Sequence, residues 1–262
     1  TLISGNLSRR VYSNYEGVNQ IEVSDNFVAG NYGITITQDA RQAIVVGNGA
    51  VTMSDTATVT KEQAGTISMN GYGIEISEGD TLAGIMGKLV DGADKIGGRV
   101  FAITAGATND TKVNGTDYAG YEPQTSYAGN NIVFMTKESG SSKTMNITCS
   151  NAELANMLGI ATAATNSGMY AEGSDVQAEF TLDNDGKRVG FADSAVISTS
   201  GTRVTVKDVN NRTFVTDVPS NVAGTQFSDT AKADDKSTAT STQTAKVTQE
   251  VTDVGTMSVH VG

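Results

Sequence analysis

The sequence predicts an α+β protein that is predominantly antiparallel β, with a β-rich domain built from both chain ends and a smaller α+β domain inserted between them. Short stretches of alternating apolar and polar residues, bounded by Asn and Gly, recur along both ends of the chain, as expected of strands joined by tight turns. The composition agrees, because 29 glycines, only two prolines and many Thr, Ser and Asn residues suit short strands. Apolar residues at helical spacing appear in the middle of the chain.

The predicted β-rich domain comprises residues 1–65 and 166–262, and the inserted domain comprises residues 66–165. Such an insertion requires the two ends of the inserted segment to lie close together on one scaffold. In the first part of the β-rich domain, period-two patterns predict strands at 21–23, 32–37 and 43–46. In its second part they predict strands at 176–182, 195–198, 202–207, 212–218 and 256–261. Residues 230–249 contain few aliphatic side chains, so we expect a solvated loop or an edge segment there.

The inserted domain should begin with a hairpin over residues 66–77 that turns at Asn70-Gly71. A helix is expected next, with Asp80 as its N-cap, although Gly84 and Gly87 each weaken it by about 1 kcal/mol relative to Ala. The apolar positions that define this helix are Leu82, Ile85, Met86, Leu89 and Val90.

The rest of the inserted domain is expected to contain a strand at 99–103, a long surface loop at 107–124 and a hairpin formed by 131–136 with 143–148. Ser150 and Glu153 form a capping box that predicts a short helix over 151–158. Leu154 and Leu158 lie four residues apart on one face of that helix, and we expect them to pack onto the strands that contain Val133 and Ile147.

The charge and the apolar runs argue against nucleic-acid and membrane partners. A formal net charge of -11 repels phosphate groups and anionic membrane surfaces. The longest apolar runs, such as residues 43–46, have the length of a strand and could not span a bilayer. The chain does not begin with Met and carries no signal-peptide pattern, so we expect an excerpt of a longer polypeptide.

The sequence offers no group of residues suited to catalysis, so no catalytic, cofactor-binding or metal-ligating residue is predicted. The only histidine, His260, lies in an alternating segment near the chain end, where a catalytic Ser-His-Asp arrangement is not expected. We expect Cys149 to be a small apolar strand residue rather than a reactive thiol. Residues 183–186 resemble the start of a calcium loop but lack its closing glutamate, which favours a turn. We therefore expect a protein that is not an enzyme and needs no cofactor.

Three tyrosines in and beside the long loop, Tyr118, Tyr121 and Tyr127, are the candidates for ligand contact. Tyrosine rings can stack on sugars, so these residues could contact host glycans. Loop tyrosines more often pack together in small satellite clusters, and that interpretation is favoured here.

The stretch "ISMNGYGIEISEGDTLAGIMGKL", within residues 66–103, resembles the flagellin hook IN motif, a repeated module of bacterial flagellins and of the flagellar filament cap protein. "NNIVFMTKESGSSKTMNIT" and "SNAELANMLGI" look like its continuation. "SGNLSRRVYSN" and "GTMSVHVG" are similar to the segments that leave and enter the helical core of flagellins. "VSDNFVAGNYGITITQDARQA" instead resembles the strand-rich opening of cap-protein outer domains.

The resemblance implies a structural, surface-exposed outer domain of a flagellin subunit, a variable region displayed on the extracellular filament next to neighbouring subunits. The alternatives are the outer domain of the cap protein and an adhesion module that binds glycans or mucins. The family's terminal helices, which form the filament core, have no counterpart in this sequence. We therefore expect the isolated chain to be monomeric.

Overall fold

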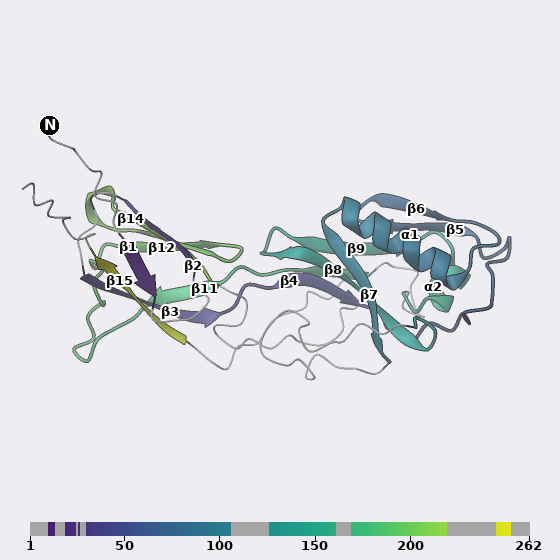
Figure 1. Cartoon of the computed structure of the whole chain (residues 1–262), viewed down its shortest axis with the longest axis horizontal. Coiled ribbons are helices and arrows are strands. Elements are labelled where there is room, and N and C mark those ends of the chain that lie inside the picture. The colour runs from purple at the N-terminus through teal and green to yellow at the C-terminus, as the bar shows by residue number, and fades with distance from the viewer. Residues whose placement is uncertain are drawn as a thin grey trace, which may run out of the picture.

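The structure is a computed structural model that describes residues 10–13, 19–24, 26, 30–105, 126–160, 169–218 and 245–252. These residues form an α+β protein dominated by antiparallel β-sheets, as the residue patterns predict. Figure 1 shows an elongated molecule with one lobe at each end of its long axis.

The left-hand lobe in Figure 1 contains two four-stranded antiparallel sheets, and we call it the sandwich lobe. In the first sheet the strand order is β1 (Arg10–Ser13), β15 (Ala245–Thr252), β3 (Gly30–Gln38) and β11 (Gln177–Phe180). In the second sheet it is β12 (Val196–Ser200), β13 (Arg203–Lys207), β14 (Thr213–Asp217) and β2 (Asn19–Val23). A 3-10 turn, η2 (Val209–Asn211), joins β13 to β14.

An aromatic cluster fills the core between these two sheets. Phe191, in the connection between β11 and β12, has its ring centroid 5.0 Å from that of Tyr32 and 5.8 Å from that of Phe214. Phe180 lies 5.3 Å from Phe191, and the Arg188 guanidinium stacks 4.0 Å from the Phe180 ring centroid. Phe191 thus joins the two sheets, and buried aliphatic side chains of β3 and β13 complete the core.

The other lobe, which we call the helical lobe, contains two further sheets and both α-helices. One sheet has the order β10 (Met169–Glu172), β9 (Thr144–Cys149), β5 (Gly65–Met69) and β6 (Tyr72–Ile76). The other has the order β4 (Gln42–Val46), β8 (Asn130–Ser139) and β7 (Gly98–Thr104). The helices are α1 (Leu82–Lys95), which packs against β6 and β7, and α2 (Ala152–Met157), which packs against β9.

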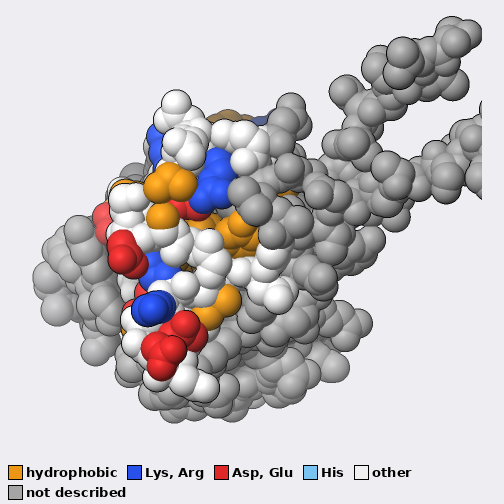
Figure 2. Space-filling model, turned by 90° about the vertical axis from the view of Figure 1, so that its left-hand side faces the viewer, with side chains coloured by type: hydrophobic (Ala, Val, Ile, Leu, Met, Phe, Trp, Pro, Cys, Tyr) orange, Lys and Arg blue, Asp and Glu red, His pale blue; other side chains and the backbone are white. Residues whose placement is uncertain are grey.

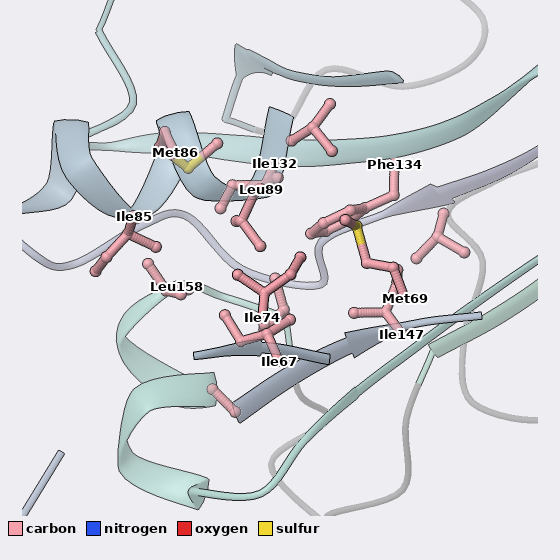
Figure 3. Packing of buried hydrophobic residues seen from close by; sticks show 14 of the residues in the cluster. Ile67, Met69, Ile74, Ile85, Met86, Leu89, Ile132, Phe134, Ile147 and Leu158 are labelled. Carbon is pink, nitrogen blue, oxygen red and sulfur yellow. The ribbon is translucent and has the colours of Figure 1, made fainter. Parts of the chain in front are cut away.

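Figure 3 shows the core of the helical lobe, where side chains from both sheets and from the helices point toward one another. The labelled residues are Ile67, Met69, Ile74, Ile85, Met86, Leu89, Ile132, Phe134, Ile147 and Leu158. All of them are buried, which confirms the apolar face expected for the hairpin at 66–77. The turn of this hairpin is also confirmed, because Met69 pairs with Tyr72 and both Asn70 (φ 49°) and Gly71 (φ 84°) have positive φ.

Both helices begin one residue later than expected. The N-cap of α1 is Thr81, whose hydroxyl accepts from the Gly84 amide (3.2 Å), and not Asp80. The N-cap of α2 is Asn151, and not Ser150 of the expected capping box. Asp80 and Ser150 were wrong as caps because their side chains accept hydrogen bonds from other groups.

Each displaced side chain has another partner. Asp80 Oδ2 accepts from the Ser77 amide (2.8 Å) and from Lys88 Nζ (2.5 Å), which closes the turn between β6 and α1. Ser150 Oγ accepts from the Thr66 amide (2.8 Å), which joins the start of α2 to β5. In both cases two adjacent residues could each have capped the helix. The other hydrogen bonds of Asp80 and Ser150 decide which of the two does so, and the capping pattern alone does not reveal them.

The expected hairpin of 131–136 with 143–148 is wrong. β8 pairs with β4 and β7, whereas β9 pairs with β5 and β10, so the two segments belong to different sheets. As predicted, Leu154 and Leu158 are buried against the core that contains Ile147. Val133, however, lies on the opposite face of β8 from that core, to which Ile132 and Phe134 of the same strand belong.

The prediction of a loop or edge segment at residues 230–249 is wrong for the last residues of that range. Residues 245–249 belong to β15, which lies between β1 and β3 in the interior of its sheet. Threonine and valine are β-branched and suit a strand, although the segment contains few larger apolar side chains. The strand expected at 256–261 lies outside the described residues.

Candidate functional site at the joint between the lobes

The chain passes between the two lobes at two adjacent places. β3 continues into β4 through residues 39–41, and β10 continues into β11 through residues 173–176. The two passages are paired, since the Arg41 amide donates to the Ser174 carbonyl (2.8 Å) and the Ser174 amide donates back to the Arg41 carbonyl (3.0 Å). The Gly140 amide also donates to the Arg41 carbonyl (3.0 Å). Backbone hydrogen bonds therefore fix the joint.

Asp175 connects this joint to turns from both lobes. Its Oδ1 accepts from the Ser141 amide (2.9 Å) and from the Gly201 amide (2.7 Å), while its Oδ2 accepts from the Ser141 hydroxyl (2.6 Å). Ser141 lies in the turn between β8 and β9, and Gly201 in the turn between β12 and β13. One carboxylate therefore links a turn of the helical lobe to a turn of the sandwich lobe.

The environment of Asp175 favours its charged form. Partial burial alone would raise the pKa of Asp175, but hydrogen bonds from the Ser141 hydroxyl and from the Ser141 and Gly201 amides hold that pKa below its ordinary value of 3.8. The carboxylate is thus ionised at neutral pH and accepts strong, charge-assisted hydrogen bonds.

Glycines let the backbones of the two passages approach closely. A Cβ on Gly173 would lie 2.4 Å from the Gly140 carbonyl oxygen and 2.5 Å from that of Arg41. Gly201 has φ +58°, a backbone conformation that favours glycine. A Cβ added to Gly140 would lie 3.2 Å from the Cα of Gly201. The joint is therefore a close contact of main chains that larger residues would force apart.

A cleft of about 770 Å³ lies beside the joint and is lined by both lobes. Its lining is polar: Gln42, Lys137, Glu138, Ser139, Ser142 and Lys143 come from the helical lobe, and Ser200, Gly201, Thr202, Arg203 and Asp217 come from the sandwich lobe. Each of its three cations has a carboxylate partner in Lys137–Asp94 (2.7 Å), Lys143–Glu138 and Arg203–Asp217 (3.3 Å). This lining offers hydroxyl groups and neutralised ion pairs.

The other positions considered from the sequence have structural roles. Burial raises the pKa of the Cys149 thiol, and its Sγ donates to the Asn151 carbonyl (3.2 Å). Asp183 forms a turn, because its Oδ1 accepts from the amides of Asp185 (2.9 Å) and Lys187 (2.8 Å). Among the described residues, no group of three or more His, Cys, Asp or Glu side chains is placed to hold a metal ion.

Of the three candidate tyrosines, Tyr127 is half-buried and packs against the core of the helical lobe. Tyr118 and Tyr121, and also His260, lie outside the described residues. The sequence-based candidates included none of the residues at the joint. The signal that could have indicated it is Gly173-Ser174-Asp175, a small turn-forming segment immediately before a strand pattern.

The end of the sandwich lobe shows no charged patch of one sign in its described part. Figure 2 shows acidic and basic side chains interspersed with apolar ones on this surface. Among the described residues, the exposed large apolar side chains are Tyr72, Leu182 and Val196. Neither described helix is both long and apolar enough to cross a membrane.

No family model matches the chain, and none of the curated proteins matches it. Among solved structures, the chain is similar to the D1-D2-D3 domains of the flagellar cap protein FliD from Escherichia coli, with 14% identity and a TM-score of 0.48, over 94% of this chain and 58% of that chain. It is also similar to the D2-D3 domains of the same protein, with 14% identity and a TM-score of 0.46, over 94% of this chain and 100% of that chain. The D2-D3 domains of FliD from Serratia marcescens give 11% identity and a TM-score of 0.39, over 85% of this chain and 98% of that chain.

These similar structures are domains of cap proteins, the second of the two flagellar candidates from the sequence, and not of flagellin. The chain spans 58% of the length of the D1-D2-D3 structure. Identities below 15% and TM-scores below 0.5 do not show membership of a family.

Proposed function

We propose that this chain is the outer, two-lobed part of a flagellar axial protein, and that the whole protein is the filament cap protein rather than flagellin. The observation that carries the proposal is the unit formed by β5, β6 and α1. The sequence that resembles the IN motif folds as a hairpin followed by a helix, and the helix lies against the strand next in the chain, β7. The resembling residues therefore form one coherent module within a larger lobe.

The choice of the cap protein rests on a second segment. Residues 23–43, which resemble the opening of cap-protein outer domains, include β3 and the passage to β4. This segment belongs to both lobes, so the resemblance extends to the connection between them. The solved structures reported above come from the same kind of protein.

The proposed role is structural and extracellular, and its partners are neighbouring subunits at the flagellum. The joint serves this role because Asp175 and the paired passages at Arg41 and Ser174 set the orientation of one lobe relative to the other. An outer part of fixed shape presents the same surface in every copy. This function requires neither a catalytic group nor a cofactor.

The sequence of the full-length protein on both sides of residues 1–262 tests the proposal. The resembled family predicts amphipathic helical segments with heptad-like spacing before and after this region, because such helices form the core of the assembly. Flanking segments without helical periodicity, or with the pattern of a membrane-spanning helix, would contradict it.

A glycan- or mucin-binding adhesion module is the second candidate, and the loop tyrosines are the residues that would carry it. Tyr118 and Tyr121 would supply stacking surfaces for sugar rings. Glycan-array binding by the full chain, lost on Tyr118→Ala or Tyr121→Ala, would support this function. Absence of binding by the unmodified chain would exclude it for the glycans on the array.

A further inference from the structure

The sequence contains three Asn-Gly pairs, and the structure describes two of them in different surroundings. Asn48-Gly49 follows β4, and Asn70-Gly71 forms the turn between β5 and β6. The third pair, at residues 114–115, lies outside the described residues. Asparagine is a chemically labile residue, and a following glycine increases its lability because no Cβ hinders the approach of the glycine amide. The two described pairs therefore offer one reaction in two structural settings.

In this reaction the amide nitrogen of the glycine attacks Cγ of the asparagine side chain. A new C–N bond forms, the proton of the glycine amide passes to the side-chain nitrogen, and that nitrogen leaves as ammonia from a cyclic succinimide. Water then opens the ring at either carbonyl, which gives aspartate or isoaspartate. In isoaspartate the main chain runs through the side chain and is longer by one carbon atom. Because the reaction is intramolecular, its rate depends on how often the glycine nitrogen and the asparagine Cγ come into bonding distance.

Asn48 and Gly49 are free to approach each other in this way. They lie in the bend after β4, where Asn48 is exposed. In the part of the chain that the structure describes, neither the Asn48 side chain nor the Gly49 amide has a hydrogen-bond partner. Hydrogen bonds fix the chain only on either side of the pair, where the amides of Gly47 and Val51 donate to carbonyls of β8 (2.7 and 2.9 Å).

Asn70, in contrast, is held against β9. Its Oδ1 accepts from the Asn146 amide (2.7 Å), and its Nδ2 donates to the Thr144 carbonyl (2.8 Å). The Asn70 amide also donates to the Asn146 carbonyl (2.9 Å). Exposure does not distinguish the two asparagines, because both are exposed. The Asn70 side chain, however, must break two hydrogen bonds before it can turn toward the Gly71 amide.

We propose that Asn48 is a site of spontaneous deamidation in the folded chain and that Asn70 is protected from the same reaction. The product at position 48 carries an additional carboxylate. The bend also lies against the end of α2, since a Cβ on Gly159 would be 2.0 Å from the Gly49 carbonyl oxygen. An extra main-chain atom in isoaspartate must displace this contact or one of the two hydrogen bonds to β8. This inference is independent of the flagellar function proposed above.

Mass spectrometry of tryptic peptides measures both sites in one sample. Cleavage after Arg41, Lys61 and Lys88 places the two asparagines on separate peptides, 42–61 and 62–88, each of which contains no other asparagine. During incubation of the folded full chain in mildly alkaline buffer, the exchange of NH₂ for OH should be at least about tenfold faster in peptide 42–61, because the Asn70 hydrogen bonds oppose the reaction. In concentrated urea the two rates should be similar, because both pairs are Asn-Gly.

Gly49→Ala tests the role of the glycine. A Cβ there would lie 3.9 Å from the Gly159 Cα, an ordinary contact, so the variant should fold and should deamidate several-fold more slowly at Asn48. Gly87→Ala, where the added Cβ meets open space, is the matched control and should leave the rate unchanged. Equal rates at Asn48 and Asn70 in the folded chain would overturn the proposal. A rate difference of the same size in urea would also overturn it, because the folded structure would then not be its cause.

The effect on the bend has its own test. The isoaspartyl form of the chain should unfold at a lower temperature than Asn48→Asp, which adds the charge without lengthening the main chain. Identical unfolding temperatures would show that the bend accommodates the extra atom and would refute this part of the proposal.

Discussion

At the scale of single residues, Asp175 links one lobe to the other. Its carboxylate accepts three hydrogen bonds, from Ser141 and Gly201, which belong to turns of different lobes. Removing the carboxylate leaves the part-buried Gly201 amide without this acceptor, whereas the exposed Ser141 donors can turn to water.

Asp175→Ala should lower the free energy of unfolding by about 1.5 to 3 kcal/mol, because hydrogen bonds to a charged acceptor are lost. Urea denaturation measures this change, with Asp193→Ala on the exposed surface as the control. A loss no greater than that of the control would mean that the Asp175 contacts do not stabilise the folded chain.

The same carboxylate predicts a pH dependence. Its pKa in the folded protein is lower than the ordinary 3.8, so its contribution is complete above that value and is lost as the pH falls through the lower, folded pKa. We expect the acid-induced loss of stability below pH 4 to be smaller in Asp175→Ala than in the unmodified chain. Parallel pH profiles of the two proteins would contradict this expectation.

Two glycines should respond in opposite ways to replacement by alanine. Gly190 has φ +80°, and a Cβ there would lie 2.1 Å from the Asn31 carbonyl oxygen, so Gly190→Ala should destabilise the sandwich lobe by at least about 2 kcal/mol. Gly87 is exposed on α1 with open space around its Cα, so Gly87→Ala should stabilise the protein by about 1 kcal/mol. Thermal unfolding of both variants gives the signs, and the same sign for both would refute the argument.

At the scale of elements, α2 is held by its N-cap and by its apolar contacts. Asn151 Oδ1 accepts from the amides of Glu153 (2.9 Å) and Leu154 (3.1 Å), and its Nδ2 donates to the Glu62 carbonyl (2.6 Å). Leu158, at the end of the helix, is fully buried. The two residues therefore stabilise the same short helix by different means.

Asn151→Ala should cost about 1 to 2 kcal/mol through loss of the cap, whereas Leu158→Ala should cost about 2 to 5 kcal/mol through loss of buried volume. Urea unfolding compares the two variants directly. Glu153→Gln keeps the side-chain length at an exposed position and serves as the control. A larger effect of Asn151→Ala than of Leu158→Ala would show that the cap dominates.

The sequence predicts elements better than it predicts which elements pair. The hairpin at 66–77 is determined locally, because Asn70-Gly71 selects a tight turn and alternation sets its buried face. The segments at 131–136 and 143–148 have equally clear strand patterns, yet they join different sheets. Pairing is decided there by contacts with β4 and β10, which are remote in the chain. The joint at Asp175 was missed for the same reason, since its partners, Ser141 and Gly201, come from two turns that are remote in the chain from Asp175 and from each other.

At the scale of the whole molecule, strand pairing indicates a larger inserted unit than 66–165. β4 pairs with β8 and β10 pairs with β9, although both strands lie outside that range. β4 also supplies Ala43 and Val45 to the core of the helical lobe. We propose boundaries near residues 41 and 174, where the chain passes between the lobes.

Residues 41–174 expressed alone should therefore unfold in one cooperative thermal transition, whereas residues 66–165 should not, because they lack two strands and part of the core. Circular dichroism during heating distinguishes the two pieces. Cooperative unfolding of 66–165 with equal stability would restore the narrower boundaries.

The isolated chain should be monomeric, because its net charge of -11 opposes association and the helices that polymerise the resembled family are not in this sequence. Sedimentation at physiological salt should give a single species near 27.1 kDa. A stable oligomer at micromolar concentration would contradict this prediction.

The proposal that this chain is the outer part of a filament cap protein can be tested on intact cells. Antibodies raised against residues 1–262 should, in immunogold electron microscopy of cells that express the full-length protein, label only the distal tips of the flagella. Labelling along the whole filament would identify a flagellin instead, and flagella without label would contradict a flagellar role altogether.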